Sequence, residues 1–226
     1  LICSWILFGF LIPRISGTIA DIISPAPSSF HFTTQVLTER EKGEDGTGSY
    51  EQFQNYLKEK ILKEYGVDSI EQLPVSFAGY ALMESEKDWK IYDKHYNEVN
   101  EIFRKQNKLV NAMNILSPVQ TQKSLSAAFA STDIHNHNYF AAQAETHRRK
   151  VQTLLNEDQL KNGIGKERGY LASAELWKTI PQFTFQQQSF ITIFKKQFYS
   201  IVLLFAWLAA GVFFLNRAGK SLRYSI

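Results

Sequence analysis

Cysteine is nearly absent from this 226-residue sequence, and its scarcity excludes several kinds of site. The one cysteine, Cys3, cannot form a disulfide framework within the chain, or a zinc or iron–sulfur centre that needs several thiolates. The G-x-S-x-G and H-E-x-x-H patterns are also missing, and Gly219-Lys220-Ser221 ends like a P-loop but lacks the earlier glycine. We therefore expect no enzyme activity in this chain, and we assign it no catalytic, cofactor-binding or metal-binding residues.

Excess positive charge is missing from the centre of the chain. Residues 25–197 contain 21 lysines and arginines and 21 aspartates and glutamates, so the formal net charge of +3 arises at the two ends. A nucleic-acid-binding domain concentrates positive charge on its folded part. We therefore expect no nucleic-acid partner.

Long apolar runs stand at both ends of the chain. Phe198–Leu215 has 18 residues without a charge, which as a helix nearly crosses a hydrocarbon core of ~30 Å, and Phe190–Phe194 can add the remaining turn. Leu1–Ile12 is shorter, but isoleucines continue its apolar stripe at helical spacing as far as Ser24. Because the chain starts inside this run and not with methionine, we expect it to be a piece of a longer protein.

These runs predict how the chain is organised across a membrane. Three basic residues follow the second run and two precede it, so the positive-inside rule favours a cytoplasmic C-terminus. The expected parts are a transmembrane helix at 1–24, a mainly helical extracytoplasmic domain at 25–189, a transmembrane helix at 190–216 and a cytoplasmic basic tail at 217–226.

Helical spacing and helix caps mark the region between the runs and predict an all-α fold, a helical bundle. The clearest pattern is a seam with 3,4 spacing in a helix from about Glu86 to Leu116. Its members are Trp89, Tyr92, Tyr96, Val99, Phe103, Gln106, Val110 and Met113. Shorter helices are expected at 49–66, 118–131, 133–162 and 170–183, with Ser49, Ser117 and either Thr132 or Asp133 as caps.

Three segments lack this helical pattern. Residues 30–36 (FHFTTQV) resemble a strand, and residues 39–48 (EREKGEDGTG) are typical of a mobile loop. Residues 73–79 (LPVSFAG) indicate a connector or a short edge strand.

One cluster has the residue types that bind metals. Asp133, His135 and His137 stand close together, and His147 follows further along the predicted helix. On a helix His135 and His137 point to opposite sides and cannot share an ion, so we interpret Asp133 as a helix cap. A metal-dependent hydrolase depends wholly on this cluster and is the weaker interpretation.

Two other groups also allow a chemical and a structural interpretation. Glu84, Glu86 and Asp88 could act as paired carboxylates, but acidic residues also complement the dipole at a solvated helix start, which we favour. The aromatic stripe of the 86–116 helix could bind a ligand, but we expect it to form the core of the bundle.

Motifs spread in order over most of the chain resemble one family of membrane proteins. They are Leu73-Pro74-Val75 with Phe77 and Gly79, Tyr92-Asp93 with Tyr96, Gln106-Asn107, Leu116-Ser117-Pro118, Leu125-Ser126, Thr132-Asp133 with His135 and Phe140, Ala144-Glu145 with Arg148, and Trp177 with Ile180-Pro181 and Phe183. On these residues the chain resembles the C-terminal part of an ABC transporter permease. The group in question is the type-2 export permeases that carry a large extracytoplasmic domain before the last membrane helix.

This resemblance implies a multi-pass subunit of a bacterial inner membrane, with the central domain on the extracytoplasmic side. Its implied partners are an ABC-type ATP-binding subunit, which holds the nucleotide site, the lipid bilayer, and a second permease copy. A bitopic sensor with a periplasmic helical bundle has the same order of span, domain, span and tail. We favour the permease, because we expect a sensor to need a signalling module after the tail.

Overall fold

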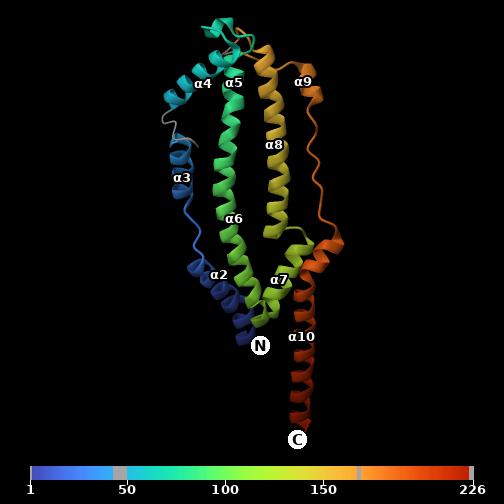
Figure 1. Ribbon diagram of the computed structural model, residues 1–226. Coiled ribbons are helices and arrows are strands. Elements are labelled where there is room, and N and C mark those ends of the chain that lie inside the picture. Colours follow the sequence, from blue (N-terminus) through green and yellow to red (C-terminus); the bar gives the residue numbers. More distant parts are fainter. Residues whose placement is uncertain (1, 43–49, 167–168, 224–226) are drawn as a thin grey trace. The chain divides into compact units, whose positions relative to one another are not determined.

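The computed structural model describes residues 2–42, 50–166 and 169–223, and these residues contain no strand. The prediction of an all-α fold is confirmed (Figure 1). Of the expected loop at 39–48, residues 39–42 are the end of a helix, whereas 43–48 and the expected cap Ser49 lie outside the described residues.

The chain divides into two compact units. Unit 1 consists of residues 1–26, 101–141 and 186–226, and unit 2 of residues 27–100 and 142–185. The division falls inside two long helices, α6 (Trp89–Ala112) and α8 (Ile134–Asn162), so each unit holds one part of both.

Unit 1 contains both apolar ends of the chain. Besides its parts of α6 and α8, its elements are α1 (Ile2–Ile6), the π-helical η1 (Leu7–Leu11), α2 (Ile12–Ile23), the 3₁₀ turn η4 (Met113–Leu116), α7 (Pro118–Phe129) and α10 (Phe190–Arg223).

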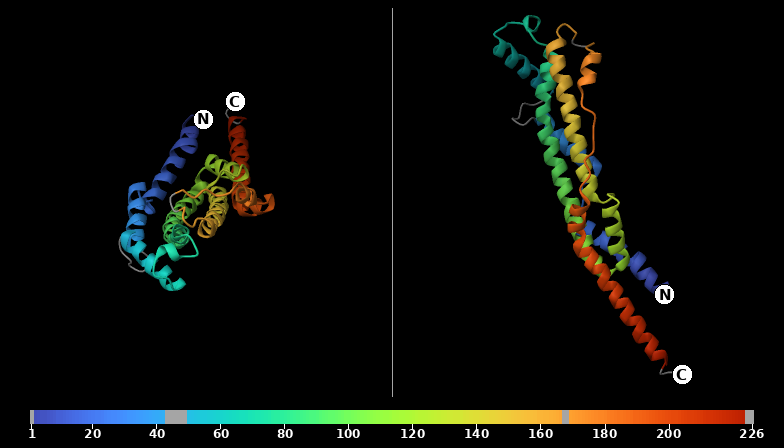
Figure 2. Two further views of the ribbon diagram at one scale, coloured as in Figure 1. Left: turned by 90° about the horizontal axis from the view of Figure 1, so that it is seen from above. Right: turned by 90° about the vertical axis from the view of Figure 1, so that its right-hand side faces the viewer.

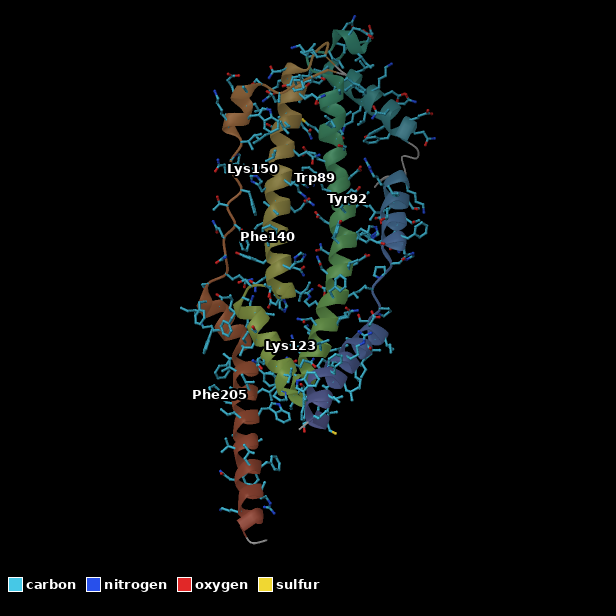
Figure 3. The ribbon with its side chains drawn as sticks, turned by 180° about the vertical axis from the view of Figure 1, so that it is seen from behind. Trp89, Tyr92, Lys123, Phe140, Lys150 and Phe205 are labelled. Atoms are coloured by element: carbon cyan, nitrogen blue, oxygen red, sulfur yellow. The ribbon has the colours of Figure 1, made fainter. Side chains whose placement is uncertain are left out.

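Two stretches of unit 1, Ile2–Ile23 and Phe190–Lys220, are long and apolar enough to cross a membrane, and little of either is buried. The start of α10 packs on α7 (Figure 1). The rings of Phe129 and Phe190 stack there, with their centres 5.5 Å apart. The later part of α10 extends past the end of α7 (Figure 2), and residues 211–220 are exposed throughout. Phe205, on the same helix, is also exposed (Figure 3).

Unit 2 contains shorter helices around the other parts of α6 and α8. Its elements are α3 (Ser29–Lys42), α4 (Tyr50–Tyr65), the 3₁₀ turn η2 (Ile70–Gln72), α5 (Phe77–Ser85), the 3₁₀ turn η3 (Glu86–Asp88) and α9 (Ala174–Thr179). Leu57 and Ile61, four residues apart on α4, are fully buried. Gly66 ends α4 with a φ of +65°, the left-handed conformation expected of a helix C-cap glycine.

The strand-like segment at 30–36 is helical, and the strand interpretation is wrong. Phe32 and Val36 lie four residues apart, so α3 presents both on one face. Val36 is buried, and the Phe32 ring packs 5.0 Å from Tyr96 of α6. Packing of this face therefore outweighs the strand propensity of the aromatic and β-branched residues.

The segment at 73–79 is also partly helical, because Ser76 caps α5 and accepts a hydrogen bond from the Gly79 amide at 3.3 Å. The Ser76 amide donates to the carbonyl of Leu160 on α8 at 2.8 Å. A Cβ atom on Gly79 would lie 2.4 Å from the Leu160 backbone. Glycine is therefore required where α5 meets α8.

The predicted long helix forms, but its seam is not its most buried face. Ile91 and His95 of α6 are buried, whereas the seam residues Tyr96 and Phe103 are 55% and 38% exposed. In unit 2 the buried face with Ile91 and His95 has α3 as a neighbour. The Phe32 ring of α3 packs on the His95 ring, 6.3 Å away. The stripe was expected to form the bundle core, and that expectation is wrong for these two aromatic residues.

The other caps agree better with the sequence. Asp133 caps α8, since its Oδ1 accepts the amide hydrogen of Asn136 at 2.9 Å, and Gly163 follows the last helical residue. The helix expected at 170–183 is limited to α9, which Ser173 caps by accepting a hydrogen bond from the Leu176 amide at 3.2 Å.

Candidate functional site

Unit 1 contains a cluster of buried neutral polar side chains around the start of α7. Ser16, Asn114, Ser117, Gln120 and Thr121 are each at most 6% exposed, and we refer to them as the polar junction. They join α2, η4 and α7. Buried polar groups are stable only when hydrogen-bonded, so their partners determine how these elements fit together.

Ser117 links α7 to the first apolar helix. Its extended backbone and the following Pro118 start α7, and its Oγ accepts the amide hydrogen of Gln120 at 3.2 Å. The Ser117 hydroxyl donates its own hydrogen to the carbonyl of Phe8 in η1, 2.8 Å away. One side chain thus caps α7 and fastens it to η1.

The Phe8 carbonyl needs this partner for a reason that lies in the sequence. In η1 the Ile12 amide donates to the Leu7 carbonyl, the longer-range bond of a π-helix. The next amide in that register belongs to position 13, and Pro13 has no N–H. The Phe8 carbonyl therefore receives no hydrogen bond from the backbone of Ile12 or of residue 13. The Ser117 hydroxyl supplies the missing donor.

The Gln120 side chain bridges a second pair of elements. Its Nε2 donates to the Val110 carbonyl at 3.1 Å, and its Oε1 lies 3.3 Å from the Ser16 hydroxyl of α2. Ser16 Oγ is also 2.7 Å from the Ile12 carbonyl. Because Ser16 has one hydroxyl hydrogen, it can donate to only one of these acceptors at a time.

Asn114 is the unsatisfied member of the polar junction. The Thr121 hydroxyl lies 2.8 Å from its backbone carbonyl, and its amide nitrogen donates to Asn111 at 3.4 Å. Its Oδ1 is buried and has no hydrogen-bond partner among the described residues. Leaving such an acceptor unpaired costs about 1–3 kcal/mol.

Unit 2 holds a different kind of contact, formed by charged residues between α6 and α8. Arg149 of α8 donates to both carboxylate oxygens of Asp93, at 2.5 and 2.8 Å, and to Glu145 at 2.7 Å. The guanidinium groups of Arg148 and Arg149 lie 5.9 and 5.1 Å from the ring centre of Trp89, which α6 directs toward α8 (Figure 3). We call these five residues the charged helix pair.

Ionisation in the charged helix pair is fixed near neutral pH. The hydrogen bond from Arg148, and then that from Arg149, lower the pKa of Glu145 to about 2. The hydrogen bond from Arg149 also lowers the pKa of Asp93, and Asp93 in turn raises the pKa of Arg149. A carboxylate with so low a pKa is a poor general base near neutral pH, so this cluster is suited to holding two helices together.

Further ion pairs fasten α3 to α6 and η3. Glu39 accepts hydrogen bonds from Lys94 at 2.8 Å and lies 2.7 Å from the buried His95 ring, which together lower the pKa of Glu39. Arg40 donates to Asp88 at 2.7 Å. Within unit 2, α3 is therefore held to α6 and η3 by charge as well as by packing.

The residues singled out as metal ligands do not come together. Asp133 is engaged as the α8 cap, and His135 Nε2 lies 3.4 Å from the amide of Asn107. His147 packs on the Phe183 ring, 5.4 Å away. Within residues 2–42, 50–166 and 169–223, no three His, Cys, Asp or Glu side chains converge on one point.

The acidic residues before α6 (Glu84, Glu86 and Asp88) bind side chains of other helices, so their interpretation as a solvated helix start is wrong. Glu86 accepts hydrogen bonds from Thr153 and Asn156 of α8 at 3.1 and 2.9 Å. Glu84 pairs with Lys60 at 3.1 Å, and Asp88 with Arg40.

The P-loop-like residues 219–221 continue α10 and therefore form no phosphate-binding loop.

The sequence pattern identified Ser117 as a cap but missed the rest of the polar junction. Serine, threonine and glutamine residues are common on exposed helix faces, so Ser16, Gln120 and Thr121 gave no signal of burial. The one available signal was Pro13, five residues after Phe8, which leaves the Phe8 carbonyl without a backbone donor only if the segment is π-helical.

The fold and these contacts define an all-α protein with two apolar helices of membrane-spanning length in one unit and a charged helix pair in the other. Residues 31–186 match the family described as Domain of unknown function (DUF3526), and the chain belongs to that family. No curated protein and no solved structure matches the chain.

Proposed function

We propose that the chain is part of the membrane-spanning permease subunit of an ATP-driven, ABC-type transporter. The observation that carries the proposal is the position of α7, which packs on α10 and bonds to η1 through Ser117. The two apolar stretches that flank the family region thus both contact one short helix. The resemblance of the chain's motifs to type-2 export permeases supplies the transporter class.

In this proposal the two apolar helices cross a bacterial inner membrane and their exposed side chains face lipid. The expected parts at 1–24, 25–189, 190–216 and 217–226 then alternate between bilayer, extracytoplasmic side, bilayer and cytoplasm. ATP is bound and hydrolysed by a separate subunit, and a second permease copy completes the transport path. The chain itself performs no catalytic step.

The polar junction gives this permease a physical route for coupling. A tilt of either apolar helix displaces α7, because Ser117 ties α7 to η1 and ring stacking ties α7 to α10. Movement of α7 is passed to α6 through the Gln120–Val110 hydrogen bond. α6 runs as one helix over Trp89–Ala112, so a displacement at Val110 acts on a long helix of the family region.

Purification of the full-length parent protein tests whether it is the permease subunit of an ABC-type transporter. We expect an ATP-binding subunit to co-purify from mild detergent in near-equal amount, and the complex to hydrolyse ATP. Co-purification of a kinase or another signalling protein in its place would contradict the permease and favour a bitopic sensor.

The variant Ser117→Ala tests the coupling route, with Ser124→Ala as a matched control on α7. We expect Ser117→Ala to leave the ATP-binding subunit bound but to lower transport per ATP hydrolysed. Unchanged transport in Ser117→Ala would contradict a role for the junction, while leaving the permease class untouched.

A further inference from the structure

A groove lies within unit 1 between α2, α6 and Ile134 at the start of α8, and no residue of the polar junction lines it. It has a volume of about 260 Å³, and its lining includes Gly17 and Ala20 from α2 and Phe103, Gln106 and Val110 from α6. The volume is below the ~300–1,000 Å³ of pockets for drug-sized ligands. It therefore suits a small head group with a short chain.

The α2 side of the groove is open because its residues are small. A Cβ atom added to Gly17 would meet no other atom within 4 Å, so glycine is not required there by close packing. Glycine in a helix interior is less stable than alanine by roughly 1 kcal/mol. Gly17 thus weakens α2 and leaves space beside it.

Asp21 is an exposed residue next to this open face, outside the groove lining, and its carboxylate contacts the lining residue Gln106. It follows Gly17 by four residues and therefore stands on the same side of α2, in the last turn of the helix. A negative charge is unfavourable there, because the C-terminal end of a helix carries partial negative charge. Among the described residues Asp21 forms no ion pair, and its carboxylate accepts only the neutral amide of Gln106 at 3.3 Å.

These features select the chemistry of a ligand. The carboxylate and the helix end both attract a cation and repel an anion. A single carboxylate is too few oxygen ligands for a calcium ion. The Phe103 ring and Val110 offer apolar surface beside the charge, which suits an ammonium group carried on an alkyl chain.

We propose that this groove binds the ammonium head of an amphipathic amine, with the head at Asp21 and the first methylenes against Phe103 and Val110. Two sources supply this chemistry: an aminophospholipid of the bilayer and a free alkylamine. The inference does not depend on an ATP-binding subunit, so its failure would leave the proposed function standing.

The first experiment measures binding of hexylammonium to the full-length parent protein in phosphatidylglycerol nanodiscs, with empty nanodiscs as the blank. Hexanol and hexanoate serve as the neutral and anionic probes. We expect hexylammonium to bind and the other two to bind up to about fivefold more weakly, since an exposed charge pair contributes up to ~1 kcal/mol. Equal binding of hexanoate would overturn the proposal.

Three variants locate the site. Asp21→Asn keeps the side-chain shape and should weaken hexylammonium binding about fivefold, whereas Glu101→Gln removes the same charge from an exposed pair with Arg104 and should change nothing. Gly17→Leu fills the groove and should abolish binding with a melting temperature at or above that of the wild type. Wild-type binding in Asp21→Asn or in Gly17→Leu would overturn the proposal.

Native mass spectrometry of protein purified with mixed phosphatidylethanolamine and phosphatidylglycerol distinguishes the two sources. Retention of phosphatidylethanolamine by the wild type and its loss in Asp21→Asn would identify the lipid as the ligand. Hexylammonium binding without retained phosphatidylethanolamine would identify a free amine.

Discussion

The two units join their helices through polar side chains of different chemical kinds. The buried polar residues of unit 1 are all neutral among those described, and they are Ser16, Asn114, Ser117, Gln120, Thr121, Asn136 and Ser200. Unit 2 buries Ser76, His95 and Asn156, but it joins its helices through ionised groups that are only partly buried, as in the Asp93–Arg149 pair. Neutral groups cost far less to remove from water than charges do. The difference fits a unit 1 that contains the apolar helices and a unit 2 that remains in contact with water.

The two units also differ in how they accommodate a local conflict in the backbone. Unit 1 compensates for a missing backbone donor at Pro13 with a side chain from another helix, Ser117. Unit 2 removes a side chain altogether at Gly79, so that two helices meet backbone to backbone. We therefore expect substitutions of Gly79 and Ser117 to destabilise their units.

The largest effect is expected at Gly79 in unit 2. Gly79→Ala places a Cβ atom 2.4 Å from the Leu160 backbone, so α5 and α8 must separate. We expect a loss of about 3 kcal/mol in the free energy of unfolding, at the upper end for overpacking. Hydrogen exchange over residues 77–85 and 150–162 measures it. Gly169→Ala, where no atom lies within 4 Å of the added Cβ, is the control and should change little.

The next largest effect is expected at Ser117 in unit 1. Ser117→Ala removes a helix cap, worth ~1 kcal/mol, and leaves the Phe8 carbonyl unpaired, so we expect a total loss of about 2 kcal/mol. Pro13→Ala restores a backbone N–H, after which Ser117→Ala should cost only the cap. Chemical denaturation of the two single variants and the double variant measures this coupling. Strictly additive losses would contradict the role assigned to Pro13.

A smaller effect is expected from acid, and only in unit 2. The pKa of Glu145 falls from 4.5 unfolded to about 2 folded, so its stabilising contribution is present above pH 4.5 and disappears as pH falls toward 2. Glu145→Gln should therefore lower the melting temperature at pH 7 and make progressively less difference between pH 4.5 and 2. A variant of unit 1, Gln120→Leu, should show a difference from wild type that is the same at every pH.

The smallest effect is expected at the exposed pair of Glu101 and Arg104 in unit 1. Such pairs on a helix surface contribute about 0.3–0.5 kcal/mol, and salt screens them. Glu101→Gln should therefore shift the melting temperature by about 1 °C or less. A loss comparable to that in Glu145→Gln would show that unit 1 also depends on charge.

Several elements could be predicted from the sequence because their signals are local. Ser117-Pro118 and Asp133 mark the starts of α7 and α8, and each makes its cap within three residues of itself. Phe198–Leu215 could only form a long apolar helix, since no charge interrupts it. Backbone hydrogen bonding within a segment decides such features, whatever packs against them.

Burial and the candidate sites could not be predicted in this way. The seam of α6 has regular spacing, yet His95 is buried and Tyr96 is exposed, although Phe32 of α3 packs on both rings. Spacing along one helix therefore did not indicate how deeply each residue is buried. The strand-like 30–36 segment is helical, and Val36 becomes buried only when the unit folds, so its own residues gave no sign of this packing.

The amino-acid sequence by itself determined the all-α class, the caps of α7 and α8 and the two apolar helices at the ends, because each depends on residues close together in the chain. The tertiary structure alone decided that Ser117 completes the backbone of η1, that Arg149 joins Asp93 to Glu145, and that Asp21 contacts Gln106 of the groove lining. The partners in the Arg149–Asp93, Gln106–Asp21 and Ser117–Phe8 contacts lie between 56 and 109 residues apart in the chain. Arg149 and Glu145 are the local exception, four residues apart. Their energies come from desolvation and hydrogen bonding across helices, which no local pattern encodes.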